Sequence, residues 1–158
     1  MNEVPNLHWY AIKAFWRRTS AVTEAFDDAG TEYYAQKILP SYIFVHTDRP
    51  TIRKLQSACF GKYYVYADRE TKEPCIVPDK EFETFRIVTS AADSGLEFLD
   101  DNPEKYQKGD KVRVTGGPFQ GAEGYVVRIK KDRRLVVTIS GVAAIATSFI
   151  PMELLEKI

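Results

Sequence analysis

The stretch GDKVRVTGGPFQGAEGYVVRI, from Gly109 to Ile129, contains five glycines and decides the fold of the C-terminal part of the chain. A phosphate-binding loop needs Lys and then Ser or Thr after its last glycine, at the start of a helix. Here Gly121 precedes Ala122 and Gly124 precedes Tyr125, with a strand-like run on each side. A phosphate loop is therefore excluded, and the glycines instead provide turns and sharp twist between two strands.

Phe119 stands at the tip of this turn, directly after Gly116-Gly117-Pro118. A single aromatic residue at a loop tip either folds back onto the core or remains exposed as a contact point. The sequence leaves both alternatives open, so Phe119 is a candidate contact residue.

The rest of the region 109–158 has the same character. The runs VRV, YVVRI, LVVTI and AIATSFI are short, β-branched and separated by turn residues, and they show no helical period. At this size the pattern predicts a small curled β-barrel of about five strands.

The region before residue 91 alternates between strand and helix patterns. Val22, Ala25, Phe26 and Ala29 have helical spacing, and Gly30 follows where a helix would end. The expected strands are 8–15, 31–36, 41–47, 62–69 and a short one within 74–78, and the expected helices are 17–29, 48–58 and 79–90. This order predicts an α+β domain with an antiparallel sheet and helices packed against it.

Charge and composition divide the chain into three parts. Residues 1–104 contain 12 Lys+Arg and 17 Asp+Glu, a net charge of −5, whereas 105–158 contain 10 and 5, a net charge of +5. The polar stretch between the two patterns contains Gly95 and Pro103. We therefore expect an N-terminal domain over 1–90, a linker over 91–108 and a second domain over 109–158.

Composition also limits the class of protein. Neither Cys59 nor Cys75 is part of a CxxC pair, and the chain shows no secretory signal or bilayer-length apolar run, so we expect a reduced cytoplasmic protein. His8 and His46 have no partners at a catalytic or metal-binding spacing. We expect no enzyme activity, no cofactor and no metal.

Two patterns resemble a known family. The stretch 109–129 resembles the KOW motif, with its valine-rich strand, central glycines and Gly-Pro-Phe. The N-terminal half is similar to the NGN domain of NusG-type transcription elongation factors, with a Trp-Tyr start and the element Leu39-Pro40-Ser41-Tyr42 before an apolar strand. Together the two patterns cover nearly the whole chain.

The stretches CIVPDKEFETF (75–85) and DRRLVVTISGVAAIATSFIPMELLEKI (132–158) further resemble the UpxY branch of this family. Members of that branch act as antiterminators on capsular polysaccharide operons. The resemblance implies a cytoplasmic monomer that suppresses pausing and termination on one such operon. The competing interpretation is an RNA-binding or ribosome-binding KOW protein, which would explain the basic C-terminal half.

The family resemblance implies that an apolar depression of the NGN domain receives a helical hairpin of the RNA polymerase clamp. By position, Leu39, Tyr42 and Phe44 lie on that surface. Tyr42 and Phe44 are two residues apart on one strand and point to the same face. Alternatively, the three side chains are part of the core.

A second implied surface faces the single-stranded non-template DNA of the transcription bubble. The sequence Phe-Trp-Arg-Arg ends where the first helix begins, and arginines favour phosphate while an aromatic ring stacks on an unpaired base. The candidate DNA-binding residues are Trp16, Arg17, Arg18, Gln56 and Ser57. A solvated charge pair beside a surface Trp is the alternative.

In the C-terminal half, the run KKDRR is expected at a hairpin tip. Such a run is either a hydrated turn or a salt-sensitive contact to RNA or another partner. With Phe119, the candidate residues for this partner are Lys130, Lys131, Arg133 and Arg134.

Two departures from the family pattern limit the comparison. The segment 30–40 is shorter than the corresponding insertion of NusG-type proteins. The barrel strand that reads Ile-Phe-Gly in general NusG proteins reads Ile139-Ser140-Gly141 here, and that aromatic helps to engage a small ribosomal-subunit protein. Coupling to translation is therefore not expected from Phe119 alone.

Overall fold

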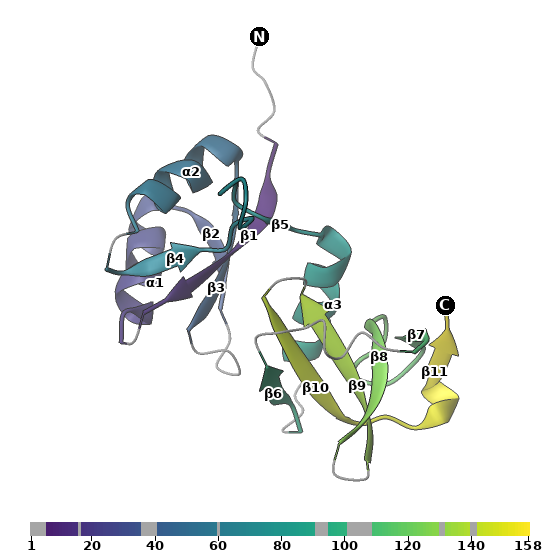
Figure 1. The fold of residues 1–158 in the computed structure, drawn as a ribbon. Helices are drawn as coiled ribbons and strands as arrows, with labels where there is room; N and C mark the ends of the chain where they lie inside the picture. Colours follow the sequence, from purple (N-terminus) through teal and green to yellow (C-terminus); the bar gives the residue numbers. More distant parts are fainter. Residues whose placement is uncertain are drawn as a thin grey trace. The chain divides into compact units, whose positions relative to one another are not determined.

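The computed structural model describes residues 6–15, 17–35, 41–59, 61–90, 95–100, 109–129, 132–139 and 142–158. It divides the chain into two compact units, residues 1–78 and residues 79–158. The two units are described separately (Figure 1).

The first unit is built on an antiparallel sheet with the strand order β2-β3-β1-β4, and β5 pairs with the remaining part of β1. In strand β1 every second side chain points to the same face, and Tyr10, Ile12 and Ala14 are in this way part of the core. The strands are β1 (His8–Ala14), β2 (Glu32–Tyr34), β3 (Tyr42–Thr47), β4 (Tyr63–Val65) and β5 (Ile76–Val77).

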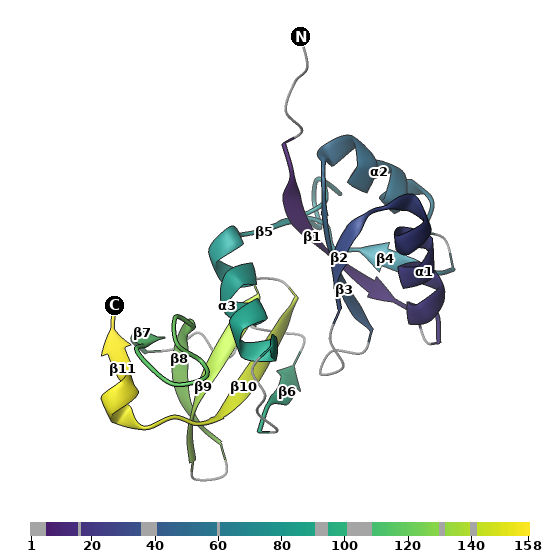
Figure 2. The same cartoon turned by 180° about the vertical axis from the view of Figure 1, so that it is seen from behind.

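Helices α1 (Thr19–Ala29) and α2 (Arg49–Ser57) cover one face of this sheet (Figure 2). Gly30 ends α1 in the left-handed conformation, at φ 71°, and its N–H donates to carbonyls of the last turn. Asp48 begins α2, because its side chain accepts a hydrogen bond from the N–H of Thr51 at 2.9 Å. Both boundaries agree with the sequence-based expectation.

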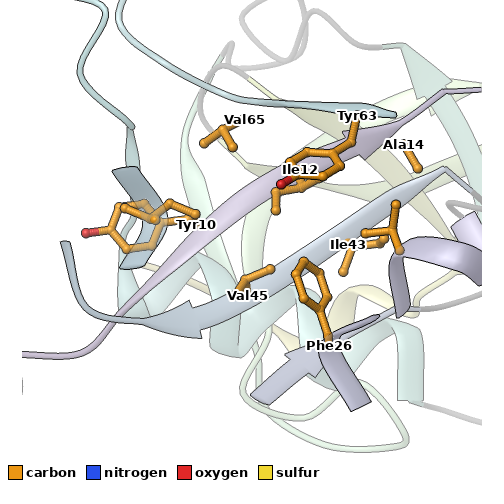
Figure 3. Packing of buried hydrophobic residues seen from close by; sticks show 10 residues of the cluster. Tyr10, Ile12, Ala14, Phe26, Ile43, Val45, Tyr63 and Val65 are labelled. Atoms are coloured by element: carbon orange, nitrogen blue, oxygen red, sulfur yellow. The ribbon is translucent and has the colours of Figure 1, made fainter. Parts of the chain in front are cut away.

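The core of the first unit lies between this face and the two helices. The ring of Phe26 from α1 lies beside Ile43 and Val45 from β3 (Figure 3). The hydroxyl of Tyr63 donates to the carbonyl of Leu55 at 2.8 Å, so its polar end is satisfied at the edge of the core. Burial of these side chains fixes which face of each strand points toward the helices.

The second unit combines a helix with a six-stranded antiparallel sheet of order β11-β7-β8-β9-β10-β6. Its buried side chains include Phe119 and Leu135. The elements are α3 (Asp79–Ser90), β6 (Glu97–Asp100), β7 (Lys111–Val114), β8 (Glu123–Ile129), β9 (Asp132–Ile139), β10 (Ala143–Phe149), a 3-10 turn (Met152–Leu154) and β11 (Leu155–Lys157). The expected α+β fold is confirmed, with β6 added to the five expected barrel strands.

Two features differ from the expected domain organisation. Helix α3 packs with the C-terminal sheet, because Val88 is buried among core residues of that unit and the Thr84 hydroxyl accepts the N–H of Glu123 at 3.3 Å. Strand β6 lies within the range 91–108 that the composition indicates as a linker, and it pairs with β10. The acidic, polar composition of that range did not indicate a strand, because β6 forms by pairing with a strand about 45 residues away in the sequence.

A buried carboxylate strengthens the contact between α3 and the sheet. The Glu123 side chain is only 6% exposed and forms ion pairs with Lys80 at 3.4 Å and Arg113 at 3.2 Å. Burial alone would raise the pKa of Glu123, but hydrogen bonds and charge from Lys80 and Arg113 outweigh it and hold the pKa below the usual 4.5.

This depressed pKa predicts an acid-sensitive contribution to folding. Since the folded pKa is lower than the unfolded one, the contribution is complete above about pH 5 and is lost as the pH falls through the folded pKa. Between pH 5 and pH 3 we expect the second unit to lose stability more steeply than the same unit in Glu123→Gln. Denaturant unfolding of both chains across this range measures the difference, and parallel pH profiles would contradict it.

Candidate functional site

The sheet face that points away from α1 and α2 carries a row of aromatic rings. Residues two apart on a strand share a face, so Tyr64 and Tyr66 lie on this face, whereas Tyr63 points to the other face, toward the helices. Ring centroids are 6.2 Å apart for Phe15 and Tyr64, 5.1 Å for Tyr64 and Tyr66, and 6.2 Å for Tyr66 and Tyr42. We call these four residues (Phe15, Tyr42, Tyr64 and Tyr66) the aromatic strip.

The strip is exposed at one end and buried at the other. Phe15 is 42% exposed and Tyr64 is 38% exposed, whereas Tyr42 is only 5% exposed. Burial, followed by hydrogen bonds with Tyr64 and Tyr42, raises the pKa of Tyr66, so its phenol stays neutral. The exposed end, formed by Phe15 and Tyr64, offers aromatic surface to an apolar partner.

The predicted polymerase-binding residues occupy different positions relative to this strip. Tyr42 and Phe44 lie on the same face of β3, since the neighbouring Ile43 and Val45 point into the helix-side core. Both rings are buried, and the Lys13 ammonium lies 5.3 Å from the centre of the Tyr42 ring. Leu39 lies outside the described residues. A direct contact by Tyr42 or Phe44 stays a prediction, and in this structure the Tyr42 ring stacks on Tyr66 within the strip.

A cluster of exposed cations adjoins the strip where β1 leads into α1. Hydrogen bonds from the Phe15 N–H to the Lys62 carbonyl and from the Arg18 N–H to the Phe15 carbonyl, both 2.9 Å, hold this corner together. Arg17, Arg18 and Lys62 are all exposed. We call these three residues the basic corner.

Arg17 has a left-handed backbone conformation, with φ 61°, which is unfavourable for residues other than glycine. Backbone strain of this kind concentrates at functional sites. The strain therefore marks the basic corner as a candidate nucleic-acid surface. Trp16, the aromatic residue predicted for this surface, lies outside the described residues.

The two other predicted DNA-binding residues are occupied by local hydrogen bonds. The Gln56 side-chain amide donates to the Lys72 carbonyl at 3.0 Å, and the Ser57 hydroxyl donates to the Arg53 carbonyl at 3.1 Å. Gln56 thus connects α2 to the loop that precedes β5. A DNA contact by either residue remains a prediction, and the structure gives each one a structural function.

Four residues of these surfaces were missed by the sequence reasoning, namely Phe15, Lys62, Tyr64 and Tyr66. Their signal lies in the run GKYYVY, where inward Tyr63 and Val65 leave Tyr64 and Tyr66 on the other face. The adjacency of Phe15 and Lys62 depends on the pairing of β1 with β4. That pairing could not be read from local sequence.

Two of the candidate partner-binding residues of the second unit also contact other residues of that unit. Phe119 is 3% exposed and packs in the core with Val114 and Leu135, so the alternative in which it folds back holds here. Arg133 contacts the sulfur of Met152. Lys130 and Lys131 lie outside the described residues.

Arg134, predicted to bind RNA, forms three hydrogen bonds within the second unit. Its guanidinium donates to the carbonyl of Gly95 at 2.6 Å, to a carboxylate oxygen of Glu97 at 2.8 Å and to the carbonyl of Thr147 at 2.5 Å. Its side chain is 13% exposed. These contacts join the segment that contains β6 to β9 and β10, and they leave the guanidinium little capacity for RNA.

The unit containing these strands matches one known family model. Residues 108–140 match the KOW motif. The KOW motif begins just before β7 and extends through β9, so Gly121, Gly124 and Phe119 all belong to it.

Solved structures add two similarities over the whole chain. A structure that describes domain interaction in Thermotoga maritima NusG aligns over 97% of this chain and 98% of its own, with 16% identity and a TM-score of 0.49. The MjSpt4:Spt5 complex in conformation A aligns over 95% of this chain and 97% of that chain, with 14% identity and a TM-score of 0.35. A search of curated proteins found no match.

The described residues contain no group of three or more His, Cys, Asp or Glu side chains that could hold a metal ion. Among the helices in the same part of the chain, none is long and apolar enough to cross a membrane. Ser140, which stands where the pattern described above has phenylalanine, lies outside the described residues.

Proposed function

We propose that this protein is a NusG-type transcription elongation factor that binds RNA polymerase and acts as an antiterminator on a polysaccharide operon. One observation carries the proposal: a KOW motif follows an α+β unit that exposes an aromatic strip beside a basic corner. The expected site of action is the cytoplasm, and the proposed active form is a monomer.

The aromatic strip is the proposed polymerase-binding surface. An apolar surface lined with aromatic side chains accepts the apolar face of a helix, and a helical hairpin of the polymerase clamp provides such a face. Phe15 and Tyr64 are exposed enough to make the contact, whereas Tyr42 and Phe44 are buried. Leu39, three residues before β3 in the sequence, remains a predicted contact residue of this surface.

The basic corner is the proposed contact to the non-template DNA strand. Exposed Arg17 and Arg18 attract phosphates, and Trp16, which precedes them in the sequence, is the aromatic residue predicted to stack on an unpaired base. A factor that binds the closed clamp more tightly than the open clamp shifts the population toward the closed state. Pausing and termination would then decrease with no chemical step on the protein.

The strip makes a direct prediction for polymerase binding. We expect Tyr64→Ser to weaken binding of the full chain to core RNA polymerase about tenfold, because it removes an exposed aromatic anchor without opening a core cavity. Titration of labelled protein with polymerase measures the affinity. Phe149→Ser, which removes a 55% exposed ring from β10, is the matched control. A loss caused by Phe149→Ser and not by Tyr64→Ser would move the docking surface to the second unit.

The basic corner predicts a change in salt dependence. Each phosphate contact to single-stranded DNA contributes about 0.7 to the slope of log K against log salt, so Arg17→Gly/Arg18→Ala should lower the slope by about 1.4 on a transcription-bubble template. Glycine at position 17 also suits the left-handed backbone, so folding is preserved. The control Arg69→Ala/Lys111→Ala removes the same charge elsewhere. An equal fall in slope for both double variants would assign the effect to net charge.

In vitro transcription through a terminator tests the operon-specific part of the proposal. Two templates are compared, one with the leader of the gene's own operon and one without it. Read-through that increases only with the leader supports a specialised antiterminator. Read-through that changes equally on both templates supports a general elongation factor, and no change on either contradicts the proposed function.

A further inference from the structure

A groove with a volume of about 370 Å³ lies between α1 and α2, on the face of the first unit opposite the aromatic strip. The two helices lie side by side over the sheet (Figure 2). The residues that line the groove are mostly apolar or small, and they include Val22, Phe26 and Leu55.

The depth of the groove comes from alanines where longer side chains would fill the space. Ala21, Ala25 and Ala29 recur at intervals of four along α1 and are exposed, and Ala58 follows α2 on the other wall. The hydroxyl of Tyr63 is already bonded to the Leu55 carbonyl. The interior therefore offers almost only apolar surface.

The charged side chains that line the groove gather at one end. Arg18 precedes α1, and Lys62 is held next to the same turn through the two backbone hydrogen bonds to Phe15. In the part of the chain that the structure describes, neither Arg18 nor Lys62 forms an ion pair with an acidic side chain. The opposite end, at Ala29 and Thr31, has no cation in its lining.

We propose that this groove binds a small amphipathic anion, with its acidic head at Arg18 and Lys62 and its apolar body between α1 and α2. The volume lies within the range of small-molecule pockets, and such pockets combine apolar walls with a few convergent polar groups. Two cations at one end match a carboxylate or another singly charged oxyanion. A ligand with a head and a tail satisfies both parts of the groove, whereas an inorganic anion would leave the apolar part empty.

Three probes with a ten-carbon chain test the proposal on the full chain, each below its micelle concentration or, for the alcohol, below its solubility limit. Sodium decanoate carries the acidic head, 1-decanol has a neutral head and decyltrimethylammonium has a cationic head. Calorimetric titration should show decanoate binding about tenfold more tightly than decanol, and no saturable binding of the cationic probe. In Arg18→Gln/Lys62→Gln the advantage of decanoate over decanol should disappear. Equal affinity for all three probes in the unaltered chain would overturn the proposal.

A second variant tests the location independently of charge. Ala25→Leu keeps a good helix former at an exposed position and fills the middle of the groove, so decanoate affinity should fall at least tenfold. Ser20→Leu adds the same side chain to α1 outside the groove lining and should bind as the unaltered chain does. Unchanged binding by Ala25→Leu would place the ligand elsewhere and defeat the proposal. Since Ala25 belongs to neither the aromatic strip nor the basic corner, polymerase and DNA binding by this variant report separately on the proposed function.

Discussion

Replacing Gly124 by alanine should destabilise the second unit by about 3 kcal/mol, the cost of forcing extra volume into a packed site. Gly124 lies on β8 opposite Val112 of β7. A Cβ added there would collide with the backbone oxygen of Val136 and would lie 3.1 Å from its carbonyl carbon. Because the obstacle is backbone of the neighbouring strand β9, it cannot move aside as a flexible side chain can.

The matched control is Gly116→Ala in the turn before Phe119. Its added Cβ would lie 3.3 Å from a terminal methyl of Leu154, which can rotate away, so we expect a change within about 0.5 kcal/mol. Hydrogen exchange at the amides of β8 and β9 measures the stability of this unit separately from the first. Equal exchange in the two variants would contradict the proposed close approach of the strands.

Arg134→Lys should release β6 and cost about 2 kcal/mol, even though it keeps the positive charge. The guanidinium bonds three groups at once, and the single ammonium of lysine cannot reproduce that planar arrangement. We expect faster hydrogen exchange in the β6–β10 ladder. Arg133→Lys, which changes the neighbouring arginine in the same way, should leave that ladder protected.

This comparison also decides between the two functions considered for Arg134. If the Arg134 guanidinium bound RNA, Arg134→Lys would weaken the affinity for single-stranded RNA, and the β6–β10 amides would exchange normally. Faster exchange of the β6–β10 amides together with unchanged RNA affinity supports the structural function of Arg134. Normal protection with weakened RNA binding would restore the original prediction.

Local sequence was sufficient for the parts of the fold that depend on neighbouring residues. Helix boundaries at Asp48 and Gly30 follow from side-chain and backbone chemistry within one turn. The spacing of Tyr42 and Phe44 correctly placed both side chains on one face of β3, opposite Ile43 and Val45 of the helix-side core.

What the sequence could not reveal depends on contacts between distant residues. Arg134 appeared to be part of a solvated charge run, but its partners Gly95 and Glu97 are 39 and 37 residues away. Helix α3 was assigned by adjacency to the N-terminal domain, although Thr84 bonds a residue 39 positions later. The exposed end of the aromatic strip likewise required the pairing of two strands.

The position of α3 also changes how the two units are tethered. A free tether over 91–108 would have 18 residues and a reach of about 60 Å. Instead, β5 ends at Val77 and α3 begins at Asp79, so Pro78 is the whole connection between those elements. A link of one residue has only a few backbone torsions that can vary, whereas an 18-residue tether would have dozens.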